Sequence, residues 1–227
     1  MTHIVLFDLD ETLYAPTTGV MDCIRDRMLE YVQTHLGLTP AEADAVRRRY
    51  LRDYGTTLRG LQIDHQVDPE EYLRLVHDVP LDRLLRENPE LDAVLASIPL
   101  TKTVFTNSSR EHAERVLSLL GIRRHFSRIV DVRDLHFESK PHPAAYQRVC
   151  GLLGVRPQEC VMVEDSLRNL QPAKALGMIT ILVSEREPAP DGIVDVSVRR
   201  VEEIGQALAE LHLDGPQNRN RQRRRVN

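Results

Sequence analysis

The stretch that decides the fold reads Ile4-Val5-Leu6-Phe7-Asp8-Leu9-Asp10-Glu11-Thr12-Leu13. Its first four residues form a short apolar run, which predicts a buried β-strand. Asp8 and Asp10 follow directly, and side chains two residues apart in an extended chain share a face. Two crowded carboxylates repel each other and lose hydration unless a cation or a shared proton occupies the site. The stretch therefore predicts a divalent-metal site at a strand end, although Asp-rich loops after strands also serve as simple turns and helix caps.

Three further polar segments add to this pattern. Lys102–Phe105 reads as a strand that ends in Thr106-Asn107-Ser108, and Cys160–Val163 reads as a strand that ends in Glu164-Asp165-Ser166. Between them, Lys140-Pro141-His142-Pro143 opens a helix-like segment. Ligands of open α/β sheets bind beyond the carboxyl ends of the strands. The segments together supply carboxylates, a hydroxyl, amides and a cation, which suits a phosphoryl group held by Mg²⁺, a lysine and hydrogen-bond donors.

The order of the four motifs is more specific than any one of them. Asp-x-Asp-x-Thr, hydroxyl-Asn, Lys-Pro and Glu-Asp-Ser, in this order, resemble the haloacid dehalogenase superfamily over residues 4 to 185. The resemblance implies that Asp8 attacks phosphorus and becomes an aspartyl phosphate. It implies that Asp10 protonates the leaving alcohol and later takes a proton from water. A halide leaves without an acid whereas an alkoxide does not, so Asp10 favours phosphoester hydrolysis over dehalogenation.

The resemblance also implies how the phosphoryl group and the metal are held. Thr106, the Asn107 backbone and Lys140 would contact the phosphoryl oxygens. We expect Mg²⁺ because all the proposed ligands are oxygen atoms and no Cys or His cluster has zinc spacing. The implied magnesium ligands are the Asp8 carboxylate, the Asp10 carbonyl oxygen and Asp165, with Glu164 acting through a bound water.

Strand-like and helix-like segments alternate along most of the chain, which predicts an α/β fold with a Rossmann-like parallel sheet and an inserted helical cap. The strand ends are expected near Phe7, Thr106, Val132, Val163 and Val183, and the helices around 110–120, 143–153, 170–176 and 201–211. Residues 15–98 contain no convincing strand and read as helices at 20–36, 41–54, 69–77 and 81–87. The predicted domains are a core of residues 1–14 and 99–213, a cap of residues 15–98, and a tail of residues 214–227.

A cap inserted directly after the first strand loop would lie over the site, exclude water and select a small leaving group. Tyr50-Leu51-Arg52-Asp53-Tyr54-Gly55 and Leu58-Arg59-Gly60-Leu61 resemble the pyrimidine 5′-nucleotidases of the superfamily. That resemblance implies hydrolysis of UMP or CMP, with Tyr54 against the base and Arg59 on a base carbonyl or the phosphate. Ordinary packing of Tyr50 and Tyr54 is the alternative. A phosphosugar, phosphoglycolate or another small phosphomonoester remains open as substrate, as does a catalytically idle binding protein.

The composition sets broad limits on the class of protein. The chain has 227 residues, and its net charge of −4 gives no case for specific nucleic-acid binding. Its three cysteines have no paired spacing, which suits a reducing compartment. No apolar span has membrane length, and the acidic residues at positions 8, 10 and 11 argue against a signal peptide, so we expect a cytoplasmic protein without a membrane partner. The basic run Arg219–Arg225 predicts a disordered tail, with a weak polyanion contact as the alternative. The oligomeric state is left open.

Overall fold

The computed structural model describes residues 4–185 and 192–211. The strands are β1 (Ile4–Phe7), β2 (Thr101–Phe105), β3 (Phe126–Val130), β4 (Cys160–Glu164), β5 (Ile179–Val183) and β6 (Val196–Val198). The α-helices are α1 (Val20–Leu36), α2 (Pro40–Tyr54), α3 (Thr57–His65), α4 (Pro69–Val76), α5 (Leu81–Leu84), α6 (Pro89–Ser97), α7 (Arg110–Leu119), α8 (Pro143–Leu153), α9 (Leu167–Ala175) and α10 (Ile204–Glu210). No helix within these residues is both long and apolar enough to cross a membrane.

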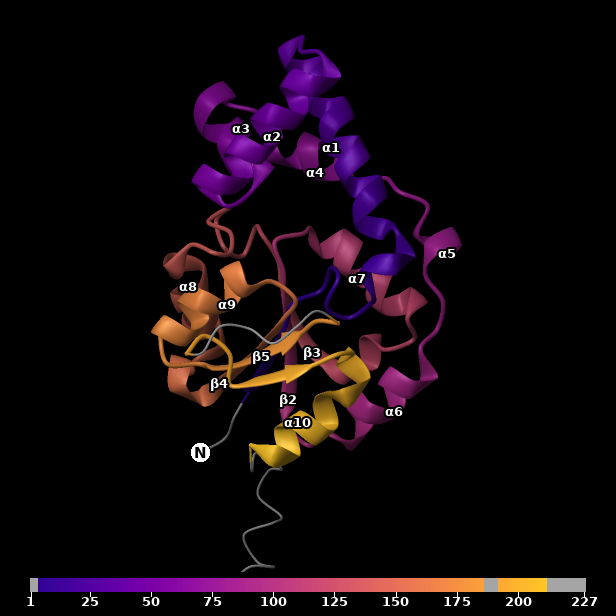
Figure 1. Ribbon diagram of the computed structural model, residues 1–227, viewed down its shortest axis with the longest axis vertical. Helices are drawn as coiled ribbons and strands as arrows, with labels where there is room; N and C mark the ends of the chain where they lie inside the picture. The colour runs from indigo at the N-terminus through magenta and orange to yellow at the C-terminus, as the bar shows by residue number, and fades with distance from the viewer. Residues whose placement is uncertain (1–3, 186–191, 212–227) are drawn as a thin grey trace, which may run out of the picture.

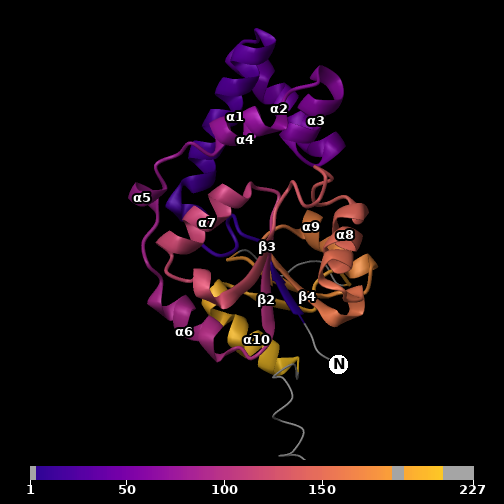
Figure 2. The ribbon, with the colours of Figure 1, turned by 180° about the vertical axis from the view of Figure 1, so that it is seen from behind.

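The strands form one parallel sheet in the order β3-β2-β1-β4-β5-β6, with helices on both faces (Figures 1 and 2). Val5 and Phe7 point into a cluster with residues of α6, α7 and α10, whereas Leu6 points into a cluster with residues of α8 and α9. A parallel sheet covered on both faces requires apolar residues at successive positions, which explains the continuous runs in the sequence. The predicted doubly covered parallel sheet is therefore confirmed.

The register of the central strands brings their loops together. Phe7, the last residue of β1, pairs with Val104 of β2 and Val163 of β4. The loops that begin at Asp8, after Phe105 and at the end of β4 therefore leave the sheet at one edge. This alignment assembles the motif residues, since parallel strands end on the same side.

Helices α1 to α4 form a separate layer above this edge of the sheet (Figure 1). They have a buried cluster of their own that includes Tyr31, Tyr50, Leu61 and Tyr72. The predicted helices at 20–36, 41–54 and 69–77 match α1, α2 and α4 closely, whereas α3 was not predicted. Helix α3 lies close against α2, and Gly60 permits this contact because a Cβ there would lie 2.2 Å from the Tyr50 ring.

The last part of the insertion packs with the sheet and not with the four-helix layer. Leu81 and Leu85 near α5, and Leu91 and Leu95 of α6, belong to the same buried cluster as the β1 residue Val5. Both helices run down the side of the sheet (Figures 1 and 2). Helices α5 and α6, which lie inside the predicted cap of residues 15–98, therefore pack with the core.

The carboxyl-terminal part of the chain adds two features. Strand β6 extends the sheet beyond β5 and was not predicted. The helix predicted at 201–211 is a short 3₁₀ turn, Val201–Glu203, followed by α10. The predicted basic tail at 214–227 lies outside the described residues.

Candidate active site

Asp8 lies where β1 ends and still pairs with β4. Its backbone N–H donates to the carbonyl of Val163 at 2.9 Å, which fixes the residue at the edge of the sheet. The Thr12 hydroxyl lies 3.2 Å from Asp8 Oδ2 and 3.1 Å from Asp165 Oδ1. A hydroxyl carries one proton, so it donates to one of these carboxylates at a time. Thr12 thus links the loops that follow β1 and β4.

Lys140 is a buried cation beside Asp8. Its Nζ donates to Asp8 Oδ1 at 2.6 Å and to Glu164 Oε2 at 3.4 Å, and its side chain is 1% exposed. Burial acts to lower the pKa of Lys140, but the charges of Asp8 and Glu164 outweigh burial and raise it. The lysine therefore stays protonated and can balance the charge of a phosphoryl group next to Asp8.

The Asn107 side chain holds the segment that carries Lys140. Its Nδ2 donates to the Lys140 carbonyl at 2.9 Å, and the Lys140 N–H donates to its Oδ1 at 2.8 Å. The motif predicts a role for the Asn107 backbone alone, so this reciprocal pair is an additional function of the residue. Thr106 is buried at the end of β2, and its hydroxyl accepts from the Ser108 N–H at 3.0 Å. Both residues shape the loop next to β1.

Asp8, Glu164 and Asp165 form a group that can hold a metal ion, since each offers an oxygen and these oxygens lie within 4.8 Å of one another. Burial and the charge of Asp8 raise the pKa of Asp165 to about 7, against the Thr12 hydrogen bond. Burial likewise raises the pKa of Asp8, and the Lys140 ion pair offsets only part of this. Such crowded carboxylates require a cation, and an all-oxygen donor set fits Mg²⁺.

Glu164 is less available to a metal than its two neighbours. Its Oε1 accepts from the Asn169 side chain, and its Oε2 lies near Lys140. Both oxygens already have donors, whereas Asp165 has only the shared Thr12 hydroxyl among the contacts of the described residues. This arrangement is compatible with the expected difference between Asp165 and Glu164.

Asp10 is surrounded by three donors that the motifs did not predict. Tyr14 donates to Oδ1 at 2.6 Å, Ser108 donates to Oδ2 at 2.6 Å, and His112 Nε2 lies 2.8 Å from Oδ1. Burial acts to raise the pKa of Asp10, but the charge of His112 and the three hydrogen bonds outweigh it and hold that pKa well below its usual range. One signal was available, because His112 falls in the first turn of the helix predicted after the Thr106 loop.

The two cap residues proposed to contact substrate lie in different surroundings. The Tyr54 hydroxyl donates to Asp64 Oδ1 at 3.1 Å, and its ring lies 5.7 Å from that of Tyr50, so its contacts are within the cap. The Arg59 guanidinium lies 4.0 Å from Glu138, which is two residues before Lys140. The structure thus brings Arg59, but not the Tyr54 hydroxyl, to the segment that carries Lys140.

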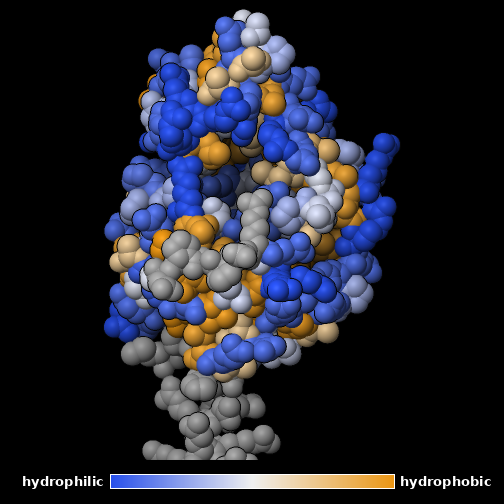
Figure 3. Space-filling model, viewed as in Figure 1, coloured by the Kyte–Doolittle hydropathy of each residue, from blue (hydrophilic) through white to orange (hydrophobic). Residues whose placement is uncertain are grey.

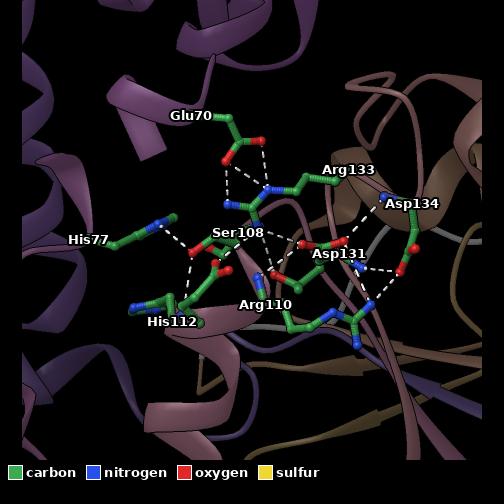
Figure 4. Close-up of polar contacts among 11 residues, drawn as sticks. Glu70, His77, Ser108, Arg110, His112, Asp131, Arg133 and Asp134 are labelled. Carbon is green, nitrogen blue, oxygen red and sulfur yellow. Dashed lines mark hydrogen bonds and ion pairs between the residues drawn. The ribbon is translucent and has the colours of Figure 1, made fainter. Parts of the chain in front are cut away.

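Two groups of contacts join the cap to the core. The Thr56 and Ser139 hydroxyls lie 3.4 Å apart beside Gly55. On the other side Arg133, in the loop after β3, donates to both oxygens of Glu70 on α4 (Figure 4). A hollow lies between the cap and the core on the face that Figure 3 shows. A separate cavity of about 1360 Å³ is bordered by Thr12 and Asp165 together with residues of the α5–α6 segment and of 199–202, and its described lining includes no residue of α1 to α4.

Comparisons with known proteins agree with this geometry. The "Phosphate metabolism protein 8" of Saccharomyces cerevisiae is 26% identical over 77% of this chain, and the match spans 59% of the yeast protein. The "Glyceraldehyde 3-phosphate phosphatase" of Methanocaldococcus jannaschii is 25% identical over 92% of this chain and 98% of its own length. The crystal structure of a HAD phosphatase from Thermococcus onnurineus has the same fold, with a TM-score of 0.59, 22% identity and coverage of 92% of this chain and 98% of that one. A family model for haloacid dehalogenase-like hydrolases matches residues 2–177, most of the 227 residues, and the chain therefore belongs to the haloacid dehalogenase-like hydrolase family.

Proposed function

We propose that the protein is a Mg²⁺-dependent phosphomonoesterase that works through an aspartyl phosphate on Asp8. The observation that carries this proposal is the position of Asp8, which has Lys140 Nζ at 2.6 Å on one oxygen and shares Thr12 with Asp165 on the other side. A nucleophilic carboxylate, a buried cation and a second carboxylate suited to a metal are the groups that phosphoryl transfer needs.

The residues divide the reaction into two steps. Asp8 attacks phosphorus, the bond from phosphorus to the alcohol oxygen breaks, and Asp10 gives a proton to that oxygen. Water then attacks the phosphoryl group on Asp8 and loses a proton to Asp10, and phosphate leaves. The environment of Asp10 favours its ionised form, which is the form that accepts a proton from water in the second step. The negative charge of a bound phosphate favours protonation of Asp10, and the protonated form is the acid of the first step.

The metal would be bound by Asp8, Asp165 and the Asp10 carbonyl oxygen, with Glu164 acting through water. When bound, Mg²⁺ supplies positive charge that stabilises the charge on the transferring phosphoryl group. Lys140, whose Nζ contacts Asp8 Oδ1, supplies a second positive charge next to the nucleophile. Thr106 and the Asn107 backbone complete the phosphate contacts.

A pyrimidine nucleoside 5′-monophosphate, UMP or CMP, is the first substrate class to test, because the cap sequence resembles pyrimidine 5′-nucleotidases. Arg59 is the better supported of the two cap contacts, since it lies beside the Lys140 segment. A phosphorylated sugar or other small phosphomonoester is the second candidate. This second candidate is favoured by the alignment with a glyceraldehyde 3-phosphate phosphatase, which covers 92% of this chain.

A panel of phosphomonoesters assayed with Mg²⁺ tests the function and separates these classes. UMP and CMP should be hydrolysed with a kcat/KM on the order of tenfold or more above AMP and GMP, because a small cap rejects a two-ring base. EDTA should abolish turnover, and Asp8→Asn should lower it by on the order of a thousandfold or more without unfolding the protein. Faster hydrolysis of glyceraldehyde 3-phosphate would select the second class, and no hydrolysis of any phosphomonoester would overturn the proposed function.

A further inference from the structure

His112 is a buried side chain without a role in the reaction described above. It lies on the first turn of α7 and is 1% exposed, and its Nε2 lies 2.8 Å from Asp10 Oδ1. Its Nδ1 has no hydrogen-bond partner among the described residues. A buried imidazole that satisfies only one of its nitrogens is costly, so the bond to Asp10 is the polar contact that accounts for its position.

The His112 ring is fixed in place by a residue from the end of the cap. The His77 ring, directly after α4, stacks on it with centroids 4.5 Å apart and planes 18° from parallel. His77 Nδ1 is itself 3.0 Å from the Ser109 hydroxyl (Figure 4). Burial and the charge of His112 lower the pKa of His77 to about 3, so His77 is neutral and stacks without charge repulsion. The His112 ring therefore has little freedom to turn away from Asp10.

The three donors leave one place open on the Asp10 carboxylate. An ionised carboxylate has about four acceptor positions, two on each oxygen. Tyr14 and His112 fill both positions on Oδ1, and Ser108 fills one on Oδ2. Among the described contacts, only the second acceptor position on Oδ2 has no donor. Because Oδ1 is held by two donors, this free position on Oδ2 points in a fixed direction.

We propose that His112 is a positioning residue which, together with Tyr14, pins Asp10 Oδ1 so that Oδ2 accepts the proton of the hydrolytic water. This inference rests on the proposed function, because it assigns His112 to the second step of that mechanism. In that step the water oxygen bonds to phosphorus, the bond from phosphorus to Asp8 breaks, and the water proton passes to Asp10 Oδ2. His112 touches neither the phosphoryl group nor the water, and acts through Asp10.

The experiment compares His112→Leu and His112→Gln on p-nitrophenyl phosphate, whose leaving group needs no acid. Formation of the aspartyl phosphate should then be little affected, while its hydrolysis slows, so kcat should fall in His112→Leu by on the order of tenfold to a hundredfold. Intact-mass spectra of acid-quenched enzyme should show a larger phosphorylated fraction at steady state than in wild type. His112→Gln should recover most of the wild-type behaviour, because a glutamine amide can donate from nearly the position of Nε2.

Two further variants keep the test decisive. Tyr14→Phe removes only the other Oδ1 donor and should also accumulate phosphoenzyme, even if His112→Leu fails to fold. His125→Leu is the matched control, since His125 Nε2 binds Asp92 at 2.7 Å before β3, at the opposite edge of the sheet. Lower kcat without phosphoenzyme accumulation in His112→Leu and Tyr14→Phe would overturn the inference and leave the proposed function standing. Absence of phosphoenzyme in every protein, with no turnover, would instead overturn the proposed function.

Discussion

At the scale of single residues, the site contains several buried carboxylates whose negative charge is only partly neutralised by nearby cations. Asp8, Glu164 and Asp165 lie within reach of one ion, and Lys140 neutralises part of their charge. Asp10 has a different environment, because donors surround it and favour its ionised form. Adjacent carboxylates with pKa values shifted in opposite directions are typical of acid–base and nucleophile pairs. The assignment of Asp8 as nucleophile and Asp10 as acid and base has this physical basis.

The raised pKa of Asp165 predicts a pH-dependent affinity for Mg²⁺. Because this pKa is about 7 in the metal-free protein, a proton competes with the metal below neutrality. The Mg²⁺ dissociation constant should therefore rise by about tenfold between pH 8 and pH 6, as measured by calorimetric titration. Without metal, the stability of the fold depends on pH in the opposite sense, because a raised folded-state pKa gives stability at low pH that is lost as pH rises through 7. Mg²⁺ binds the deprotonated form, so it should raise the melting temperature more at pH 8 than at pH 6. Equal dissociation constants at the two pH values would contradict this assignment.

At the scale of elements, the loop after β3 contacts the cap and also carries Lys140. Val132 is buried in the cap cluster and Phe137 packs against it, while Arg133 binds Glu70 of α4. His136 and Phe137 both have positive φ angles, 54° and 60°, which are costly for residues other than glycine. Their conformation is held by the surrounding packing. The position of the cap and that of Lys140 therefore depend on one segment.

A substitution at Gly55 is the simplest test of whether the cap and the Lys140 segment depend on each other. A Cβ at Gly55 would lie 3.0 Å from Pro141 Cδ and 3.4 Å from the Lys140 carbonyl oxygen. Gly55→Ala should therefore lower kcat/KM, because the cap can no longer close on the Lys140 segment. It should also cost about 1 kcal/mol of unfolding free energy, since the φ of +90° favours glycine.

Gly37→Ala is the matched control for that variant. Gly37 also ends a cap helix with a positive φ, +65°, but a Cβ there would contact nothing within 4 Å. It should lose a similar unfolding free energy in denaturant titrations and keep wild-type kcat/KM. Equal activities of the two variants would show that closure of the cap does not depend on the Gly55 contact.

At the scale of the whole molecule, the sequence was sufficient to predict strands β1 to β5 and the motif loops, but not the edge strand β6. Runs such as Ile4–Phe7 are apolar at every position because both faces of the sheet are covered, and this local pattern predicts the strands. The loops then meet at one edge by the geometry of parallel strands alone. Asp8, Lys140 and Asp165 could be placed together in this way before their distances were known.

The features that sequence could not supply depend on long-range pairing. His112 meets Asp10 across 102 positions, and its place in the first turn of a predicted helix does not show which residue it contacts. Helix α6 was not predicted, and its partners, the 3₁₀ turn Val201–Glu203 and α10, lie near the other end of the described chain. The contacts of Tyr54 with Asp64 likewise required the unpredicted helix α3. The motifs therefore predicted which loops meet at the edge of the sheet, whereas the surroundings of Asp10 and the packing of α5 and α6 required the structure.

The most direct test of the account is chemical identification of the phosphorylated residue. Borohydride reduces an aspartyl phosphate to homoserine, and the protein can be treated with it during turnover of a phosphomonoester with Mg²⁺, then digested and sequenced by mass spectrometry. Position 8 should read as homoserine in the wild-type protein and remain unmodified in Asp8→Asn, because Asp8 is the carboxylate that bonds to phosphorus. Reduction at another carboxylate such as Asp165, or turnover without any reducible residue, would contradict the central claim.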